Sequence, residues 1–425
     1  MNTTNAPPGG FSAVIRTYYK RVTAFSPNAR KYLISTILFG SAMGVYRLLF
    51  NFYVLSLGYD EALLGNLITA SSITALIVAL PMGYLADILG RKLSLILGNT
   101  FVGIAVLMIV LFPSVPIFIA MNILMGIAQS LSGVTMGPFL MENSADEERT
   151  YLFSFSSGLR MTASSVGNWI GGYMPAWFGV WLGVNAVSAP AYAWSLGGIV
   201  FLVFIALIPK LMLRSKHLPT EERSVFAPIS YMIKNPSKLG KLVLPMLITS
   251  IGAGLLMPFM NIFFRNVHNQ SDAAIGTMFA WGSLAMGIGL LIAPALADRF
   301  GKIQVVVISQ AISIPFLALL GFSPWFSLSA LAYYVRLTLM NMSSPVYQTF
   351  VMEQVDPESR AMVASLTSMA HNFGWAFSPM LSGWFQVNYG FGPAFVSTIT
   401  LYAIAVLMYY LFFWRKRKRV APAHG

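Results

Sequence analysis

Four basic side chains stand inside long apolar stretches of this chain: Arg47, Arg160, Arg336 and His371. All fourteen acidic residues lie near the ends of those stretches or between them, so no carboxylate stands at the same depth. Burying an arginine inside a membrane is unfavourable in free energy unless its positive charge is compensated. Three kinds of compensation are possible: a water-filled cavity, hydrogen bonds to backbone carbonyls, or a negatively charged substrate. We favour the third, because the planar guanidinium group fits carboxylate, phosphate or sulfonate.

Two further side chains share helix faces with this basic set. Asn51 follows Arg47 by four residues and Trp375 follows His371 by four, so each pair lies on one face of a helix. His371 can titrate near neutral pH or act only as a hydrogen-bonding group. The predicted substrate-binding residues are Arg47, Asn51, Arg160, Arg336, His371 and Trp375.

A second set of charges stands in short polar turns and recurs at a constant spacing. Asp87 and Gly90 recur 211 residues later as Asp298 and Gly301. A carboxylate at a helix end can cap the positive N-terminus of another helix, and an arginine can hold a carboxylate. The alternative is a set of solvated loop charges worth less than about 1 kcal/mol each. The residues of these turns and of the neighbouring helix ends are Gly83, Asp87, Gly90, Arg91, Glu142, Arg149, Asp298, Gly301, Glu353 and Arg360.

The elements that must position these residues are membrane-spanning helices. Of the 425 residues, 56% are apolar and 10% are charged, whereas a soluble domain carries about 25% charge. A helix needs roughly 20 apolar residues to cross the bilayer. The apolar runs predict twelve spans, at residues 32–56, 62–86, 93–112, 116–142, 151–178, 191–213, 241–264, 273–297, 303–322, 325–351, 361–386 and 394–414.

Basic residues are unevenly distributed about these spans. They precede the first span, follow the even-numbered spans and fill the central connection, and only Arg265 falls on the other side. Lys and Arg favour cytoplasmic loops, so both termini are predicted to be cytoplasmic. The net charge of +13 therefore reflects orientation in the membrane and contact with anionic lipid headgroups rather than nucleic-acid binding. The predicted organisation is an N-terminal tail (1–31), a six-helix bundle (32–213), a cytoplasmic loop (214–240), a second six-helix bundle (241–414) and a basic tail (415–425).

The offset of 211 residues relates the two halves throughout. Gly65 matches Gly276 and Pro113 matches Pro324, in addition to the charged turns. A constant offset across helices and loops indicates two six-span halves of common ancestry. The predicted fold class is therefore an all-α integral membrane protein with two pseudo-symmetric six-helix bundles.

The sequence GYLADILGRK at residues 83–92 resembles the cytoplasmic signature of the major facilitator superfamily. It departs from that signature at Ile88, where the family has a basic residue, and the second copy departs at Pro294. Glu142 and Arg149 resemble the pattern that follows span four in sugar porters. The resemblance implies a twelve-helix transporter in which the residues of the charged turns given above form a conformational gate that latches the cytoplasmic ends when the transporter faces outward. It also implies a substrate site between the two halves near the bilayer midplane.

Span five resembles in part a glycine-rich motif of the drug:proton antiporter branch of this superfamily. Ala163 replaces its first glycine and Asn168 replaces its proline, which returns only in the second half as Pro379. Small residues four apart let helices approach closely, so ordinary helix packing is an equal alternative. The predicted packing motif consists of Gly167, Asn168, Gly171, Gly172, Gly374, Pro379 and Gly383.

These observations predict a secondary transporter that moves a small organic anion by alternating access of its two halves. A drug-type exporter of lipophilic compounds and a lipid or lysolipid flippase are the alternatives. An enzyme is not expected, because no clustered set of acids, histidines or metal ligands and no phosphate-binding loop is present. We expect no cofactor, metal or nucleic acid. The expected partners are a small-molecule substrate, membrane lipids and, as a candidate coupling ion, protons. The protein is expected to be a monomer in the cell (inner or plasma) membrane.

Overall fold

The computed structural model describes residues 25–214, 236–355 and 360–415. Every regular element in these ranges is a helix. The N-terminal half contains α2 (Pro27–Ser56), α3 (Glu61–Ile77), α4 (Ala79–Leu89), α5 (Arg91–Leu111), α6 (Val115–Glu142), α7 (Asp146–Leu182), α8 (Ala189–Ile205) and α9 (Leu207–Leu211). The C-terminal half contains α11 (Pro236–Leu256), η1 (Met257–Phe259), α12 (Met260–Asn266), α13 (Asp272–Phe300), α14 (Lys302–Phe322), α15 (Phe326–Glu353), α16 (Arg360–Tyr389), α17 (Gly392–Tyr409) and η3 (Tyr410–Trp414).

Helices are observed over all twelve predicted spans. Some spans consist of more than one helix, such as the span made by α3 and α4, whose axes differ by 59° at the bend between them. Within the described residues, eight helices are long and apolar enough to cross a membrane, or nine if that bent pair is one span. The three remaining rods are α7, α15 and α16, which carry Arg160, Arg336 and His371. Their polar residues lower their hydropathy, as expected for helices that neighbours partly shield from lipid.

The predicted domain boundaries fall close to helix ends. Ser26 caps α2, and Pro27 occupies its first turn, where proline is favourable. The helix therefore begins inside the tail predicted at 1–31, and α11 begins at Pro236, inside the loop predicted at 214–240. The rest of these segments, residues 1–24, 215–235 and 416–425, lies outside the described part of the chain.

Two glycines of the charged turns let the chain reverse between helices. Gly90 joins α4 to α5 with a φ of 78°, and Gly301 joins α13 to α14 with a φ of 92°. Side chains other than hydrogen are disfavoured at such positive φ angles. The recurrence of glycine at a 211-residue spacing therefore has a backbone reason.

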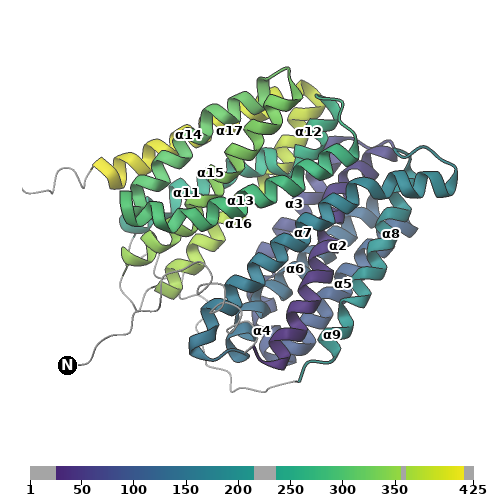
Figure 1. Cartoon of the computed structure of the whole chain (residues 1–425), viewed down its shortest axis with the longest axis horizontal. Helices are drawn as coiled ribbons and strands as arrows, with labels where there is room; N and C mark the ends of the chain where they lie inside the picture. Colours follow the sequence, from purple (N-terminus) through teal and green to yellow (C-terminus); the bar gives the residue numbers. More distant parts are fainter. Residues whose placement is uncertain (1–24, 215–235, 356–359, 416–425) are drawn as a thin grey trace, which may run out of the picture.

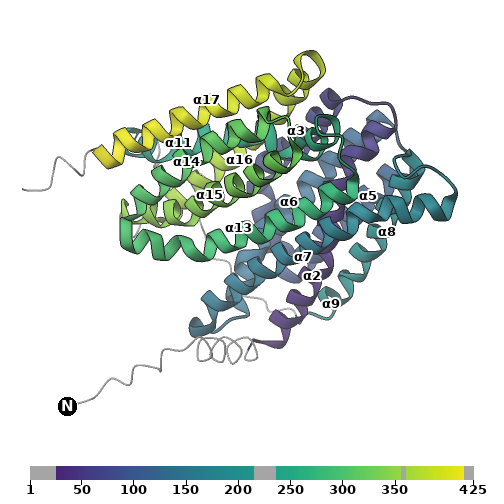
Figure 2. The same ribbon diagram turned by 45° about the horizontal axis from the view of Figure 1, so that its top comes forward.

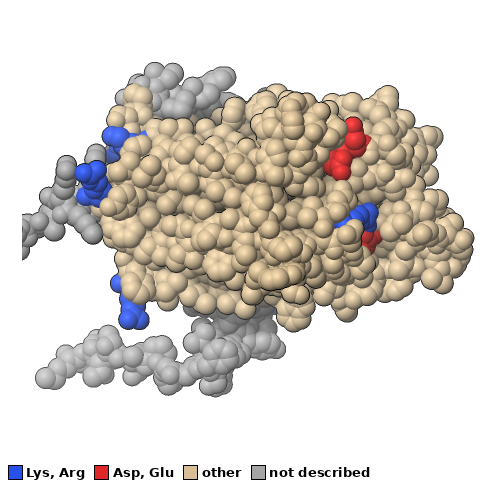
Figure 3. All heavy atoms as spheres, turned by 90° about the horizontal axis from the view of Figure 1, so that it is seen from above, with Lys and Arg blue, Asp and Glu red and all other residues tan. Residues whose placement is uncertain are grey.

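The two halves form separate bundles that lie side by side (Figures 1 and 2). Contact between them is made mainly by α3 against α16 and by α7 against α13. On the face in Figure 3, charged side chains gather towards the two ends, and a wide zone between them carries none. That distribution fits a belt of the surface that faces lipid.

Glycines let the helices of opposite halves approach closely at both crossings. At each of four positions a Cβ atom would overlap a backbone carbonyl oxygen of the other half. The glycine–carbonyl pairs are Gly65 with Pro379 and Gly383 with Glu61 at the α3–α16 crossing, and Gly276 with Asn168 and Gly172 with Asp272 at the α7–α13 crossing. The second two pairs are the repeat mates of the first two, so the joint between the halves is itself pseudo-symmetric.

The hydrophobic core is shared by the halves at one end only. The largest cluster joins residues of both halves, such as Phe52 and Phe263, near the starts of α3 and α13, which we call the opposite end. Near the starts of α5 and α14, which we call the basic end, each half has its own cluster. The halves are therefore joined at the opposite end and separate at the basic end, where the bundles diverge in Figure 1.

Candidate functional site

The charges of the first gate turn form ion pairs within the N-terminal half. Arg91 at the start of α5 contacts Asp87 of α4 (Nη1 to Oδ1, 2.6 Å) and Glu142 of α6 (Nε to Oε1, 3.1 Å). No atom of a neighbouring helix lies within 4 Å of the place where a Cβ on Gly83 would stand. The side chain of Arg149 lies outside what the structure describes. In this conformation the described charges tie α4, α5 and α6 together.

The second gate turn repeats part of this arrangement in the C-terminal half. Lys302 at the start of α14 pairs with Glu353 at the end of α15. Asp298 is exposed, and the side chain of Arg360 is outside the described residues. The position of Lys302 corresponds to that of Arg91, so a basic residue at the start of this helix bridges to the neighbouring helix in both halves.

Arg47 and Arg160 lie on neighbouring helices of the N-terminal half. Gly40 lets α2 approach the backbone of Arg160 on α7. Both arginine side chains are exposed, although Arg47 stands 20 residues after Pro27, where α2 begins. Arg160 is close enough to Arg47 for the two positive charges to repel. Neither side chain has an ion pair with the acids that the structure describes, so two uncompensated charges stand at one accessible place.

His371 and Trp375 lie one turn apart on α16, with ring centroids 6.4 Å apart. The imidazole is exposed, while the backbone carbonyl of His371 accepts a hydrogen bond from Ser250 of α11. The indole N–H of Trp375 is buried and has no hydrogen-bond partner within the described ranges. Because His371 is the repeat mate of Arg160, the two side chains take equivalent positions in the two halves.

Arg336 does not join this exposed group. It is 1% exposed in the interior of the C-terminal half. Its guanidinium donates to the hydroxyl of Tyr402 on α17 (2.7 Å) and to the sulfur of Met257 in η1 (2.9 Å). Arg336 is therefore a packed interior residue, and the neutral Tyr402 hydroxyl and Met257 sulfur accept hydrogen bonds from its charged group.

Asn51 lies in the joint between the halves at the opposite end. Its amide donates to the carbonyl oxygen of Pro258 (2.8 Å) and to the side-chain oxygen of Asn261 (3.0 Å). Asn261 in turn donates to the carbonyl of Leu48 (2.9 Å). Asn51 is buried, so these contacts connect α2 to the end of the seventh span rather than extend the exposed patch around Arg47.

Residues of the predicted packing motif make helix contacts both within one half and between the two halves. Gly167 lies against Ser41 of α2 and Gly171 against Val45, which joins α7 to α2 within one half. Gly374 lies against Ser250 of α11 and plays the same part in the second half. Asn168, Gly172, Pro379 and Gly383 supply the contacts between the halves described above.

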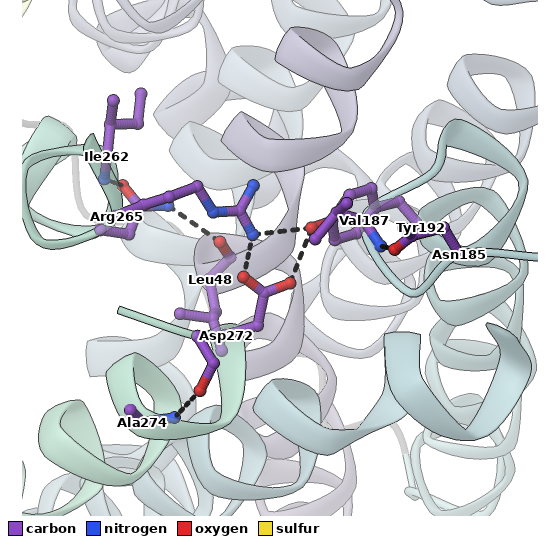
Figure 4. A network of polar contacts seen from close by, with 10 residues as sticks. Leu48, Asn185, Val187, Tyr192, Ile262, Arg265, Asp272 and Ala274 are labelled. Carbon is purple, nitrogen blue, oxygen red and sulfur yellow. Dashed lines mark hydrogen bonds and ion pairs between the residues drawn. The ribbon is translucent and has the colours of Figure 1, made fainter. Parts of the chain in front are cut away.

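A polar network at the opposite end was not predicted from the sequence (Figure 4). Arg265 at the end of α12 pairs with Asp272 at the start of α13. Tyr192 of α8 donates its hydroxyl to Asp272 (2.7 Å) and accepts a hydrogen bond from Arg265 (2.6 Å). The guanidinium carbon of Arg265 also lies 3.3 Å from the ring centre of Phe52 on α2. The available signal was Arg265 itself, the only basic residue assigned to that side.

The comparison with protein families decides how this two-bundle architecture is classified. The family described as Major Facilitator Superfamily matches residues 32–249 and again residues 242–424. The chain belongs to the major facilitator superfamily. Its two matches reproduce the two halves, and the protein is a multi-pass membrane transporter of the secondary type.

Two relatives of this chain are described as multidrug resistance proteins. The chain is 22% identical over 347 residues to "Multidrug resistance protein MdtG" of Dickeya zeae (strain Ech586), which covers 79% of this chain and 81% of that protein. It is 23% identical over 352 residues to the protein of the same description from Salmonella choleraesuis (strain SC-B67), covering 80% and 82%.

Solved structures of other transporters share the fold. The nucleoside transporter NupG superposes with a TM-score of 0.71 at 16% identity, covering 91% of this chain and 98% of its own. A bacterial homolog of the human lysosomal transporter Spinster, in an inward-facing and unoccupied conformation, gives 0.71 at 15% identity, covering 91% and 97%. A D-xylose-proton symporter gives 0.67 at 15% identity, covering 93% and 98%. At these identities the likeness concerns the fold alone.

Proposed function

We propose that this major facilitator carries a small organic anion, bound near Arg47 and Arg160 while the two halves rock about it. The observation that carries the proposal is the exposure of two adjacent arginines far from the helix ends, without a described acidic partner. A carboxylate, phosphate or sulfonate would supply the missing charge through charge-assisted hydrogen bonds. The substrate site of this architecture lies between the halves near the midplane.

The other predicted binding residues divide into two groups. His371 and Trp375, which occupy the equivalent stretch of α16, are proposed to complete the site from the C-terminal half. Arg336 and Asn51 are assigned to packing and to the joint between the halves, because both terminal nitrogens of the Arg336 guanidinium and the amide nitrogen of Asn51 already donate to partners inside the protein. Protons remain a proposed coupling ion, with exposed His371 as the proposed carrier.

We further propose that the basic end faces the cytoplasm, in line with the positive-inside distribution of Lys and Arg. In that orientation the conformation described here is closed outside and separated inside. The charged gate turns, with Asp87, Arg91 and Glu142 in the first half, would then bridge the halves only when the basic end closes. Their present pairing inside one half supports this role, because it leaves them assembled at the surface that must close.

The test is the thermal stability of the detergent-purified protein in the presence of carboxylates, organic phosphates, sugars, neutral lipophiles and lipophilic cations. A ligand that binds the folded state raises its apparent stability by mass action, by about 2.7 kcal/mol at a hundredfold excess over Kd. Anions are expected to raise the unfolding temperature of the wild type and not that of Arg160→Ala. Arg299→Ala is the matched control, because Arg299 is exposed at the basic end and should leave the response intact.

Export of lipophilic compounds is the second candidate function. The relatives described as multidrug resistance proteins favour it. If lipophilic compounds raise the unfolding temperature, anions do not, and Arg160→Ala changes neither response, this candidate replaces the anion proposal.

A further inference from the structure

The network of Arg265, Asp272, Tyr192 and Phe52 draws its members from both halves of the transporter. Arg265 and Asp272 belong to the C-terminal half and lie on either side of the turn between α12 and α13. Tyr192 on α8 and Phe52 on α2 belong to the N-terminal half. When the halves separate at this end, the ion pair can move as a unit, but its contacts with Tyr192 and Phe52 must break.

These contacts are made in surroundings that strengthen them. The side chain of Asp272 is 9% exposed and that of Arg265 is 21% exposed. Asp272 is the only buried carboxylate among the residues that the structure describes. Hydrogen bonds to charged groups are stronger than neutral ones, and a partly desolvated cation over an aromatic face gains further. Tyr192 is fully buried, so its hydroxyl depends on this pair for both of its hydrogen bonds.

The repeat does not supply a second network of this kind. The repeat mate of Asp272 is Glu61, which accepts a hydrogen bond of 3.3 Å from Asn266 in an exposed setting. The glycine–carbonyl contacts at the two crossings are pseudo-symmetric, as described above. Among the described residues, however, a buried carboxylate that pairs with an arginine and a tyrosine hydroxyl is found only on the α7–α13 side. A pocket of about 340 Å³, lined by Arg265, Asp272 and Gly172 among others, lies beside it.

We propose that Tyr192 is a positioning residue for transport, because it latches the Arg265–Asp272 pair of the C-terminal half to the N-terminal half and holds the opposite end closed. The latch rests on alternating access between the halves and not on the identity of the substrate. Removing the Tyr192 hydroxyl deprives the ion pair of its hydrogen bonds across the joint while the aromatic ring stays in place. The population ratio of the closed conformation to the conformation that is open at this end should therefore fall by about tenfold.

Thiol labelling tests the latch, because the native chain has no cysteine. Ser165→Cys reports on the closed joint, since Ser165 is 5% exposed and donates a hydrogen bond to the carbonyl of Ala280 across the α7–α13 crossing (2.9 Å). Ser157→Cys reports on the separated region, because Ser157 is exposed two turns nearer the basic end of α7. Each reporter is labelled with a water-soluble maleimide on the detergent-purified protein, where the reagent reaches both ends, in the wild-type and Tyr192→Phe backgrounds.

The latch predicts opposite changes at the two positions. In Tyr192→Phe, labelling at position 165 should rise by about tenfold while labelling at position 157 falls. The matched control is Tyr46→Phe, because the Tyr46 hydroxyl is buried without a hydrogen-bond partner in the described structure and its removal should change neither rate. Asp272→Asn should act in the same direction, and its effect should be smaller when Tyr192→Phe is already present, as for residues of one network.

Two results would overturn the proposal. Unchanged labelling at position 165 in Tyr192→Phe would mean that the hydroxyl does not hold the joint. A rise at both positions would mean that the substitution loosens the fold generally and does not shift one conformation towards the other.

Discussion

The substitution Gly172→Ala should shift the transporter away from the conformation described here. A Cβ atom on Gly172 would lie 2.6 Å from the carbonyl oxygen of Asp272, where ordinary contacts begin at 3.4 Å. Helices α7 and α13 must therefore separate by about 0.8 Å, the difference between these two distances. Overpacking of this kind costs about 1–3 kcal/mol. That cost changes the ratio of the two conformations by roughly 5- to 150-fold.

The pair of thiol reporters at Ser157 and Ser165 measures this ratio. We expect Gly172→Ala to lower labelling at the first position and to raise it at the second. Gly197→Ala on α8 is the matched control, because nothing lies within 4 Å of the added atom. It has the same helix-propensity gain of about 1 kcal/mol without the overlap. If Gly172→Ala behaves like Gly197→Ala, the close crossing does not maintain this conformation and the reasoning fails.

Two further predictions concern the charged turn and the histidine beside the joint. Asp87→Asn removes one of the two carboxylates that hold Arg91, so the transport rate should fall while ligand affinity stays unchanged; full turnover would remove the gate assignment. Burial lowers the pKa of His268 in the folded protein, so the unfolded state binds more protons and stability should decrease as the pH falls below about 6.5. Comparison of unfolding temperatures at pH 5 and pH 7.5 checks this, and an equally large decrease in His268→Gln would contradict it.

The fold was predictable because it depends on features that are local in the sequence. Apolar runs of about 20 residues fix where the chain can cross a bilayer, and at least one helix is observed over each of the twelve predicted spans. The 211-residue repeat predicted two related halves, and the glycine pairs at the crossings show why the repeat extends into the spans. Gly65 and Gly276 are retained where only a hydrogen atom fits against a carbonyl of the other half.

The surroundings of single side chains were less predictable, because they depend on which helices meet. Arg336 shares the mid-span depth of Arg47, but the neighbouring hydroxyl of Tyr402 and sulfur of Met257 are 66 and 79 residues away in the sequence. The same limit applied to Asn51, whose partners lie more than 200 residues further along the chain. Periodicity identifies the face of a helix but not the element that covers it.

The network at Tyr192 was missed for a related reason. Asp272 has the position of an ordinary acidic residue in the first turn of a helix, and such residues are favourable without any partner. Only the packing of α8 and α12 against that turn makes the carboxylate a buried group that contacts both halves. The internal repeat did not indicate the network either, because the equivalent residue Glu61 makes its hydrogen bond in an exposed setting.

The measurement that tests the central proposal most directly is the dissociation constant of the most stabilising anion for four proteins: the wild type, Arg47→Ala, Arg160→Ala and Arg336→Met. Hydrogen bonds to a charged group are worth about 1.5–3 kcal/mol, so the first two substitutions should each weaken binding by roughly 10- to 150-fold. Arg336→Met should bind as the wild type does, because it replaces a packed side chain by an apolar one of similar length. Unchanged affinity in Arg47→Ala and Arg160→Ala, or a loss confined to Arg336→Met, would contradict the anion site.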